Sequence, residues 1–320
     1  MNQPDAEIIS LDSVNEELRF AGSHSPDLET ERAAREVRTR VMGEIDRLGL
    51  RSYVGDIEID GYAILPPEVV GVPRSFVEEL REKALEAAER DSFMKVDVRP
   101  DKVNEIADAA SMFGQSKFAS SILHLDPLFE KALMNEPMLA IMSYLLGESC
   151  RIQSTMAMKK GPGRDYMLLH ADNNHTATPV VFPSIPEHAN ATWILTDYDE
   201  ANGSTCLVKG SHRYCRYPTS HEARDITLYD NPITAKAGSI LIHHGNVWHG
   251  SVPRRLSGYR VSVVLTFCRW YGYMHQQAWQ SLSEEAFERN PPRFATLTGK
   301  TQSMGYGDPK GRLKSLTPFA

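Results

Sequence analysis

Residues 237–267 read AGSILIHHGNVWHGSVPRRLSGYRVSVVLTF, and this stretch decides the fold. It contains a short apolar strand, a turn that carries His249, and a second apolar strand that begins at Arg260. Other short β-rich segments precede it, separated by turns of Gly, Pro, Asn and Asp: CRIQSTMAMKK at 150–160, ATWILTDYD at 191–199 and STCLVKG at 204–210. Short strands with turn residues between them are typical of an antiparallel barrel or sandwich. We therefore expect an all-β core from Cys150 to Tyr271.

The sequence before Cys150 has helical periodicity. Helices are predicted over residues 29–50, over 72–91, and over 126–147 with an interruption near Pro137. Residues 57–67, IEIDGYAILPP, alternate and contain Asp-Gly, which predicts short strands around a turn. The N-terminal helices would buttress one outer face of the β core.

Composition excludes several classes of protein. The chain has 320 residues, is 41% hydrophobic and carries a net charge of −7, so extensive disorder and a basic nucleic-acid-binding surface are both disfavoured. Four cysteines are too few for a disulfide scaffold, and no apolar run approaches the roughly 18 residues that span a membrane. The N-terminus lacks the pattern of a secretory signal, so we expect a cytoplasmic protein.

The stretch MLLHADNNH at 167–175 holds the first chemical motif. His170 and Asp172 are separated by one residue, and such residues point to the same side of an extended strand. His249 follows 77 residues after Asp172 (249 − 172) within the same β-rich region. Two histidines and one carboxylate form the facial triad of non-haem Fe(II) oxygenases. An isolated His-x-Asp is often only a surface pair, so the second histidine decides the interpretation.

Arg260 lies 11 residues after His249 (260 − 249), in the apolar strand YRVSVVLTF. A buried arginine is costly unless it meets an anion. The co-substrate 2-oxoglutarate is a dianion whose far carboxylate suits the two parallel hydrogen bonds of a guanidinium. Ser251 and Ser262 are hydroxyl donors nearby in sequence. The pattern therefore predicts a 2-oxoglutarate site beside the metal.

Taken together, His170-x-Asp172, NGSTCLVKGSHR at 202–213, His249-Gly250-Ser251 and Arg260 resemble the phytanoyl-CoA dioxygenase family of Fe(II)/2-oxoglutarate oxygenases. DGYAILP at 60–66 is similar to the usual start of that family, so the resemblance covers roughly residues 53–270. It implies a mainly β fold with α, a double-stranded β-helix (jelly roll, cupin-like) buttressed by N-terminal helices.

The resemblance also implies roles for single residues. His170, Asp172 and His249 would bind iron, and Arg260 would hold 2-oxoglutarate with help from Ser251. Gln153 stands where related enzymes place a co-substrate-binding glutamine. Trp193 stands where the family often has an aromatic residue lining the pocket, although core packing explains it equally well.

The implied function is an Fe(II)-, 2-oxoglutarate- and O2-dependent oxygenase. Because Asp172 fills the position that related halogenases leave to a halide, we expect hydroxylation of a C–H bond. The stretch 173–190, with three prolines and several apolar residues, is either a packed surface loop or a lid over a fairly hydrophobic small-molecule substrate.

The alternatives are a 2-oxoglutarate-independent cupin-type metalloenzyme and a non-catalytic binding protein on the same fold. We expect an N-terminal helical and mobile extension at 1–52, a catalytic domain at 53–275 and a C-terminal extension on or near the core at 276–320. A homodimer is allowed, without nucleic acid or a membrane span.

Overall fold

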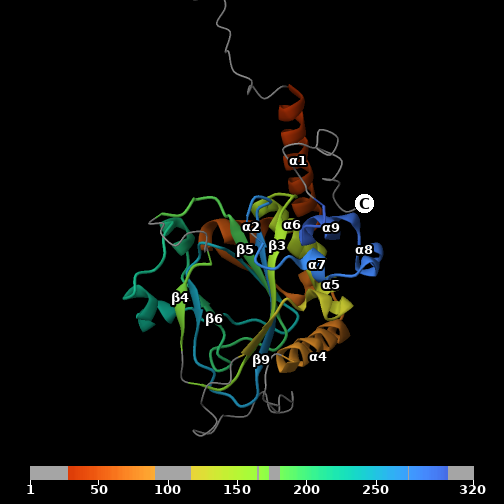
Figure 1. Ribbon diagram of the computed structural model, residues 1–320. Coiled ribbons are helices and arrows are strands. Elements are labelled where there is room, and N and C mark those ends of the chain that lie inside the picture. The colour runs from red at the N-terminus through yellow and green to blue at the C-terminus, as the bar shows by residue number, and fades with distance from the viewer. Residues whose placement is uncertain (1–27, 91–116, 164–165, 173–180, 273, 302–320) are drawn as a thin grey trace, which may run out of the picture. The chain divides into compact units, whose positions relative to one another are not determined.

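A computed structural model describes residues 28–90, 117–163, 166–172, 181–272 and 274–301 (Figure 1). The chain divides into two compact units, residues 1–40 and 41–320. Helix α1 (Leu28–Arg47) begins in the first unit and ends in the second. In the first unit, the described residues 28–40 are all helical. The predicted domain limits at 52/53 and 275/276 stay predictions.

Two antiparallel sheets form the centre of the second unit. The six-stranded sheet has the order β1-β7-β5-β9-β3-β2, and the three-stranded sheet has the order β4-β8-β6. The strands of the larger sheet are β1 (Tyr62–Leu65), β2 (Lys117–Ser120), β3 (Arg151–Lys160), β5 (His188–Ile194), β7 (Ile240–His244) and β9 (Arg260–Cys268). Those of the smaller sheet are β4 (Met167–His170), β6 (Thr205–Leu207) and β8 (His249–Ser251). This mixed α and β architecture around a jelly-roll core confirms the predicted fold class.

Helices cover the face of the larger sheet that points away from the smaller sheet (Figure 1). They are α2 (Arg51–Asp60), α3 (Pro67–Val70), α4 (Arg74–Arg90), α5 (Pro127–Leu133), α6 (Glu136–Leu146), α7 (Ala278–Ser281), α8 (Glu284–Arg289) and α9 (Pro292–Thr298). Short 3-10 helices lie at η4 (Ile122–His124), η5 (Ser211–Tyr214), η6 (Glu222–Arg224) and η7 (Ile226–Tyr229). Helices α4 and α6 contact the central strands of the larger sheet, as the predicted buttress requires.

The N-terminal strand prediction is half wrong. Residues 57–60 belong to α2 and only 62–65 form a strand. Gly61 ends α2 in the left-handed conformation, with φ at +88°, so the Asp-Gly pair is a helix C-cap and not a hairpin turn.

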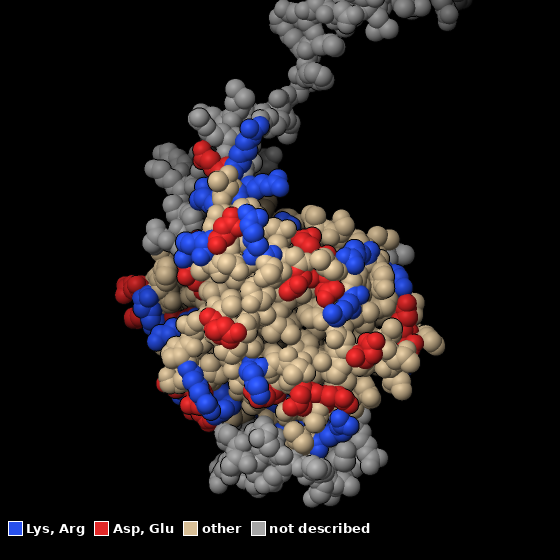
Figure 2. Space-filling model, turned by 180° about the vertical axis from the view of Figure 1, so that it is seen from behind, with Lys and Arg blue, Asp and Glu red and all other residues tan. Residues whose placement is uncertain are grey.

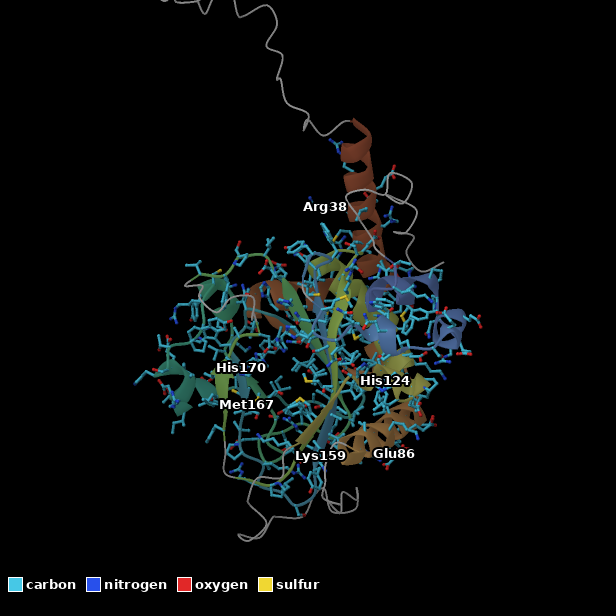
Figure 3. All side chains as sticks on the ribbon, in the orientation of Figure 1. Arg38, Glu86, His124, Lys159, Met167 and His170 are labelled. Atoms are coloured by element: carbon cyan, nitrogen blue, oxygen red, sulfur yellow. The ribbon has the colours of Figure 1, made fainter. Side chains whose placement is uncertain are left out.

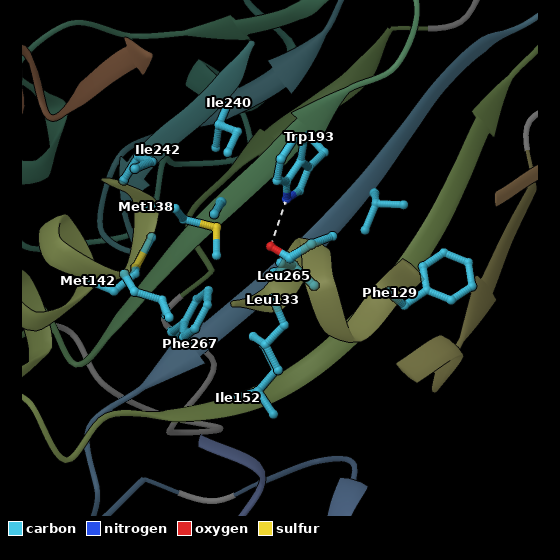
Figure 4. Packing of buried hydrophobic residues seen from close by; sticks show 14 of the residues in the cluster. Phe129, Leu133, Met138, Met142, Ile152, Trp193, Ile240, Ile242, Leu265 and Phe267 are labelled. Carbon is cyan, nitrogen blue, oxygen red and sulfur yellow. Dashed lines mark hydrogen bonds between the residues drawn. The ribbon is translucent and has the colours of Figure 1, made fainter. Parts of the chain in front are cut away.

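A large apolar cluster lies between the larger sheet and the helices (Figure 4). Trp193 of β5 is fully buried there, and its indole N–H donates to the carbonyl of Ala132 across 3.2 Å. Phe294 and Leu297 of α9 belong to the same cluster, so the C-terminal helices pack on the core. The inner face of the same sheet carries both polar and apolar side chains, among them Asn190, Arg260, Met156 and Met158.

The surface seen in Figure 2 carries acidic and basic side chains interspersed, which is the ordinary pattern of a solvated face. None of the described helices is both long and apolar enough to cross a bilayer.

Glu130 joins the C-terminal helices to α5. Its carboxylate is 3% exposed and accepts hydrogen bonds from the Arg289 guanidinium and from Asn290 Nδ2 at 2.6 Å. We expect Glu130→Gln to lower the free energy of unfolding by about 1.5 kcal/mol, because the buried carboxylate loses its charge-assisted hydrogen bonds, whereas the Arg289 side chain is 42% exposed and stays hydrated. Denaturant unfolding measures this change.

Glu136→Gln is the matched control, because Glu136 pairs with Arg47 on an exposed surface. Its loss should stay within about 0.5 kcal/mol. Equal unfolding midpoints for the two variants would contradict the assigned role of Glu130.

Candidate active site

A cavity of about 150 Å³ lies between the two sheets. Its lining comes from seven strands, the turn after β4 and the loop after β5: Met156, Met158, Met167, His170, Asp172, Asn190, Thr192, Tyr198, Thr205, Leu241, His243, His249, Arg260, Ser262 and Val264. The mouth lies at β4, where Met167 and the side chain of His170 are about two-fifths exposed. Figure 3 shows these two residues together on that strand.

His170, Asp172 and His249 meet at this mouth. His170 ends β4 and His249 begins β8, and the two residues are directly paired across the antiparallel ladder. Asp172 reaches both, with its oxygens 3.5 Å from His170 Nε2 and 3.4 Å from His249 Nε2. One ligand atom from each of the three side chains lies within 4.8 Å of the other two. Such a group can hold a single metal ion.

Backbone carbonyls orient both imidazoles. His170 Nδ1 donates to the carbonyl of Leu168 at 2.8 Å, and His249 Nδ1 donates to that of Val247 at 3.1 Å. Because Nδ1 carries the proton in each ring, Nε2 keeps its lone pair. Burial lowers the pKa of His249 to about 3, so this ring is neutral at pH 7, as a metal ligand must be.

Asp172 does not lie on a strand with His170, because β4 ends at His170. Instead its N–H donates to the carbonyl of Gly245, and Asn190 Nδ2 donates to its carboxylate at 2.5 Å. Burial raises the pKa of Asp172, but the neighbouring histidines and Asn190 lower it by more, so the net shift is downward and favours the carboxylate. A turn and an amide therefore bring about the convergence that was predicted from strand alternation.

Arg260 lies deeper in the same cavity, at the start of β9, and is 5% exposed. Its Nη1 donates to the carbonyl of Gly203 at 2.7 Å, and the guanidinium lies over the Tyr198 ring at 4.6 Å. Its buried Nε has no hydrogen-bond partner within the described structure. A buried donor without a partner is costly, and an anion in the cavity would satisfy it.

The other predicted cofactor residues lie elsewhere. Trp193 faces the helices and not the cavity. Gln153 is buried with its amide 3.0 Å from His188 Nε2, and Ser251 Oγ accepts from Lys160 Nζ at 2.6 Å. None of these three lines the cavity. Trp193 packs in the apolar core, which was the stated alternative to a role in lining the pocket.

Sequence reasoning missed Asn190 and Tyr198, both of which line the cavity. It expected one of His243 and His244 to point inward without binding the metal, since the spacing to Arg260 favoured His249, and His243 does line the cavity. Asn190 and Thr192 share one face of β5, and that alternation was the only signal in the sequence. His243 lies with its ring 4.5 Å from the ring of His249.

The predicted lid begins with residues 173–180, which lie outside the described part of the chain. Beyond them, Phe182 packs on Ala171 and Trp248, directly behind the metal-site turn. Val181 and Ile185 beside it are exposed.

Comparison with known families gives one match over most of the chain. A family model described as Phytanoyl-CoA dioxygenase (PhyH) matches residues 57–262. The chain is 28% identical over 165 residues to Dioxygenase ALT11 of Alternaria alternata, covering 48% of this chain and 53% of the relative. It is 32% identical over 117 residues to Dioxygenase FUM3 of Gibberella moniliformis, covering 36% and 37%. The matches thus span about half or less of the relatives' own lengths.

Solved structures share the fold. The non-heme alpha ketoglutarate dependent epimerase SnoN from nogalamycin biosynthesis has a TM-score of 0.51 and 16% identity, over 69% of this chain and 83% of that chain. HygX of Streptomyces hygroscopicus, crystallised with nickel and 2-oxoglutarate, has a TM-score of 0.53 and 14% identity, over 70% and 88%. The part of the fold that these structures share with this chain is the jelly-roll core.

Proposed function

Since this chain belongs to the phytanoyl-CoA dioxygenase family of Fe(II)- and 2-oxoglutarate-dependent oxygenases, we propose that it hydroxylates an unactivated C–H bond of a small, fairly hydrophobic substrate. The reaction would use Fe(II), 2-oxoglutarate and O2, and would release succinate and CO2. The observation that carries this proposal is the meeting of His170, Asp172, His249 and Arg260 in one cavity.

The triad fits a divalent iron site. His170 and His249 would bind through Nε2, and Asp172 would bind through one carboxylate oxygen. Two imidazoles and one carboxylate leave coordination positions open for a co-substrate. Asn190 would hold Asp172 in place, because its amide donates to Oδ2.

Arg260 would hold the far carboxylate of 2-oxoglutarate. Its unpartnered Nε and its position in the triad's cavity support this assignment. The Tyr198 ring and the Gly203 carbonyl fix the guanidinium plane, so little side-chain freedom is left to lose on binding. Ser251 does not line this cavity, and its hydroxyl accepts from Lys160 instead.

Iron and 2-oxoglutarate, when bound, would supply the oxidising power for adding one oxygen atom from O2 to the substrate. The protein orients the C–H bond and excludes water. Met156, Met158 and Met167 give the cavity an apolar and adaptable wall, which supports a substrate with hydrophobic bulk.

We also infer a reducing, cytoplasmic setting, which the four free cysteines support: Cys150, Cys206, Cys215 and Cys268. A homodimer stays a prediction that light scattering of the purified protein would test.

Turnover should depend on iron. We expect the purified protein with Fe(II), O2 and 2-oxoglutarate to form succinate, and removal of the metal with a chelator to reduce succinate to background. Fe(II) should restore the reaction, whereas Zn(II) should occupy the site without restoring it, because zinc has no redox chemistry. Succinate is measured by chromatography. The candidate substrates are metabolites made by the enzymes that neighbouring genes encode.

Succinate formation that survives metal removal would overturn the proposal. Where the reaction does depend on iron, the mass of the product distinguishes hydroxylation, which adds one oxygen atom, from desaturation or rearrangement.

A further inference from the structure

The strand that carries His170 contains an irregularity. In the β4–β8 ladder, Met167 pairs with Ser251 and His170 pairs with His249. Two residues of β4 between these pairs therefore face one residue of β8, Gly250. This arrangement is a β-bulge.

The bulge changes which side chains reach the cavity. Met167 and His170 are three positions apart, so strict alternation would point them to opposite faces of the sheet. Both nevertheless line the cavity. The direction of the His170 side chain thus depends on the bulge keeping its shape.

The Tyr229 hydroxyl binds the backbone of this bulge. It accepts a hydrogen bond from the Leu169 N–H at 2.9 Å and lies 3.0 Å from the carbonyls of Met167 and Ala223, to either of which it can donate its proton. The tyrosine is 6% exposed and packs with Leu169, so water does not readily replace it. Between the two bound β4 residues stands Leu168, whose carbonyl orients the imidazole of His170.

Gly250 closes the bulge from the other side. A β-carbon at this position would lie 2.4 Å from the Met167 carbonyl oxygen and 3.1 Å from a ring carbon of Tyr229. The bulge therefore lies between Gly250 of β8, which has no side chain, and the Tyr229 ring, whose hydroxyl forms hydrogen bonds with the bulge backbone.

We propose that Tyr229 is a positioning residue for the metal centre, and that its hydroxyl fixes the bulge so that His170 Nε2 points at the ion. This rests on the proposed function in one respect, which is that His170 is a metal ligand. Tyr229 does not line the cavity, so it acts through β4 and has no contact with metal or substrate.

The test is Tyr229→Phe in the full chain, which keeps the ring and removes only the hydroxyl. Anaerobic titration with Co(II), followed by its visible absorption bands, reports both affinity and ligand geometry. We expect the Kd for Co(II) to rise about 10- to 100-fold, as is usual when a group behind a metal ligand is lost, and the absorption bands to shift. Tyr144→Phe is the control, because that hydroxyl donates to Glu58 on surface helices and should leave both readouts unchanged.

Circular dichroism melting of the metal-free proteins and hydrogen exchange of the Leu169 amide accompany the titration. Faster exchange at Leu169 together with weaker Co(II) binding supports the proposal. A wild-type Kd and spectrum in Tyr229→Phe overturns it, and so does a loss of Co(II) binding that only follows general unfolding. His170→Ala distinguishes failure of the Tyr229 proposal from failure of the proposed function. If this variant binds Co(II) as tightly as the wild type, the proposed metal site itself is wrong.

Discussion

Arg260→Gln should raise the Kd for 2-oxoglutarate by about 30-fold or more while leaving metal binding intact. Loss of one partner of a buried, hydrogen-bonded charge pair costs at least about 2 kcal/mol, and each 1.36 kcal/mol corresponds to a factor of ten. Glutamine keeps a polar side chain but is shorter and has neither the charge nor the two parallel donors of the guanidinium. Isothermal titration with 2-oxoglutarate, on protein loaded anaerobically with metal, measures the change.

Arg255→Gln is the matched control. Arg255 is largely exposed and pairs with Glu200 on the surface, so its loss should leave the Kd for 2-oxoglutarate unchanged. Succinate as an added ligand tests the same contact, because it keeps the far carboxylate but lacks the keto acid. An unchanged Kd in Arg260→Gln would favour the cupin-type alternative, in which the triad works without 2-oxoglutarate.

The cavity residues that sequence reasoning found are those with unusual chemistry for their surroundings. An arginine in YRVSVVLTF and histidines among apolar strands are conspicuous because burying them is costly without a partner. Short strands and turn residues, which need no knowledge of long-range contacts, predicted an antiparallel barrel or sandwich, and the family resemblance narrowed this to a jelly roll. Both predictions therefore depend on local composition.

Local composition also predicts side-chain direction along β5, although the family resemblance left Trp193 open between the cavity and the core. Every residue of β5, from His188 to Ile194, is buried, because helices cover one face and the cavity occupies the other. Burial therefore does not alternate along β5, but the residue types do: the polar His188, Asn190 and Thr192 alternate with Ala189, Ala191 and Trp193, which places Trp193 on the apolar face. Thr192 lines the cavity, so the side chain of its neighbour Trp193 points into the apolar core.

The bulge in β4, by contrast, could not be predicted. MLLH gives no sign of an extra residue, and the glycine that allows it lies on another strand, at position 250. The hydroxyl that binds it comes from Tyr229, about 60 residues further along the chain. Such a feature depends on three segments meeting, and local patterns do not encode that.

Substitution of the second histidine ligand should have the largest effect on Fe(II) binding. Three histidines line the cavity, and the spacing to Arg260 predicted His249, not His243, as the second ligand. The structure supports that choice, because His243 is absent from the set of mutually close ligand atoms among the described residues. We expect His249→Ala to weaken Fe(II) binding by more than about 100-fold, since even groups behind a ligand cost up to that much. Anaerobic titration measures it, and succinate formation should fall to background.

His243→Phe tests the same assignment from the other side. Phenylalanine keeps a planar ring against His249 but has no nitrogen, so any metal bond from position 243 would be lost with it. The ring of His243 lies 4.5 Å from the ring of His249 and its nitrogens are outside the set of mutually close ligand atoms, so Fe(II) affinity should change by less than about tenfold, which is the lower end of the effect of a supporting group. A reversed result, with His249→Ala retaining iron and His243→Phe losing it, would move the ligand from β8 to β7. In that case the ligand would leave the strand pair that joins His249 to His170, and the triad would have to form across the two sheets instead of along one ladder.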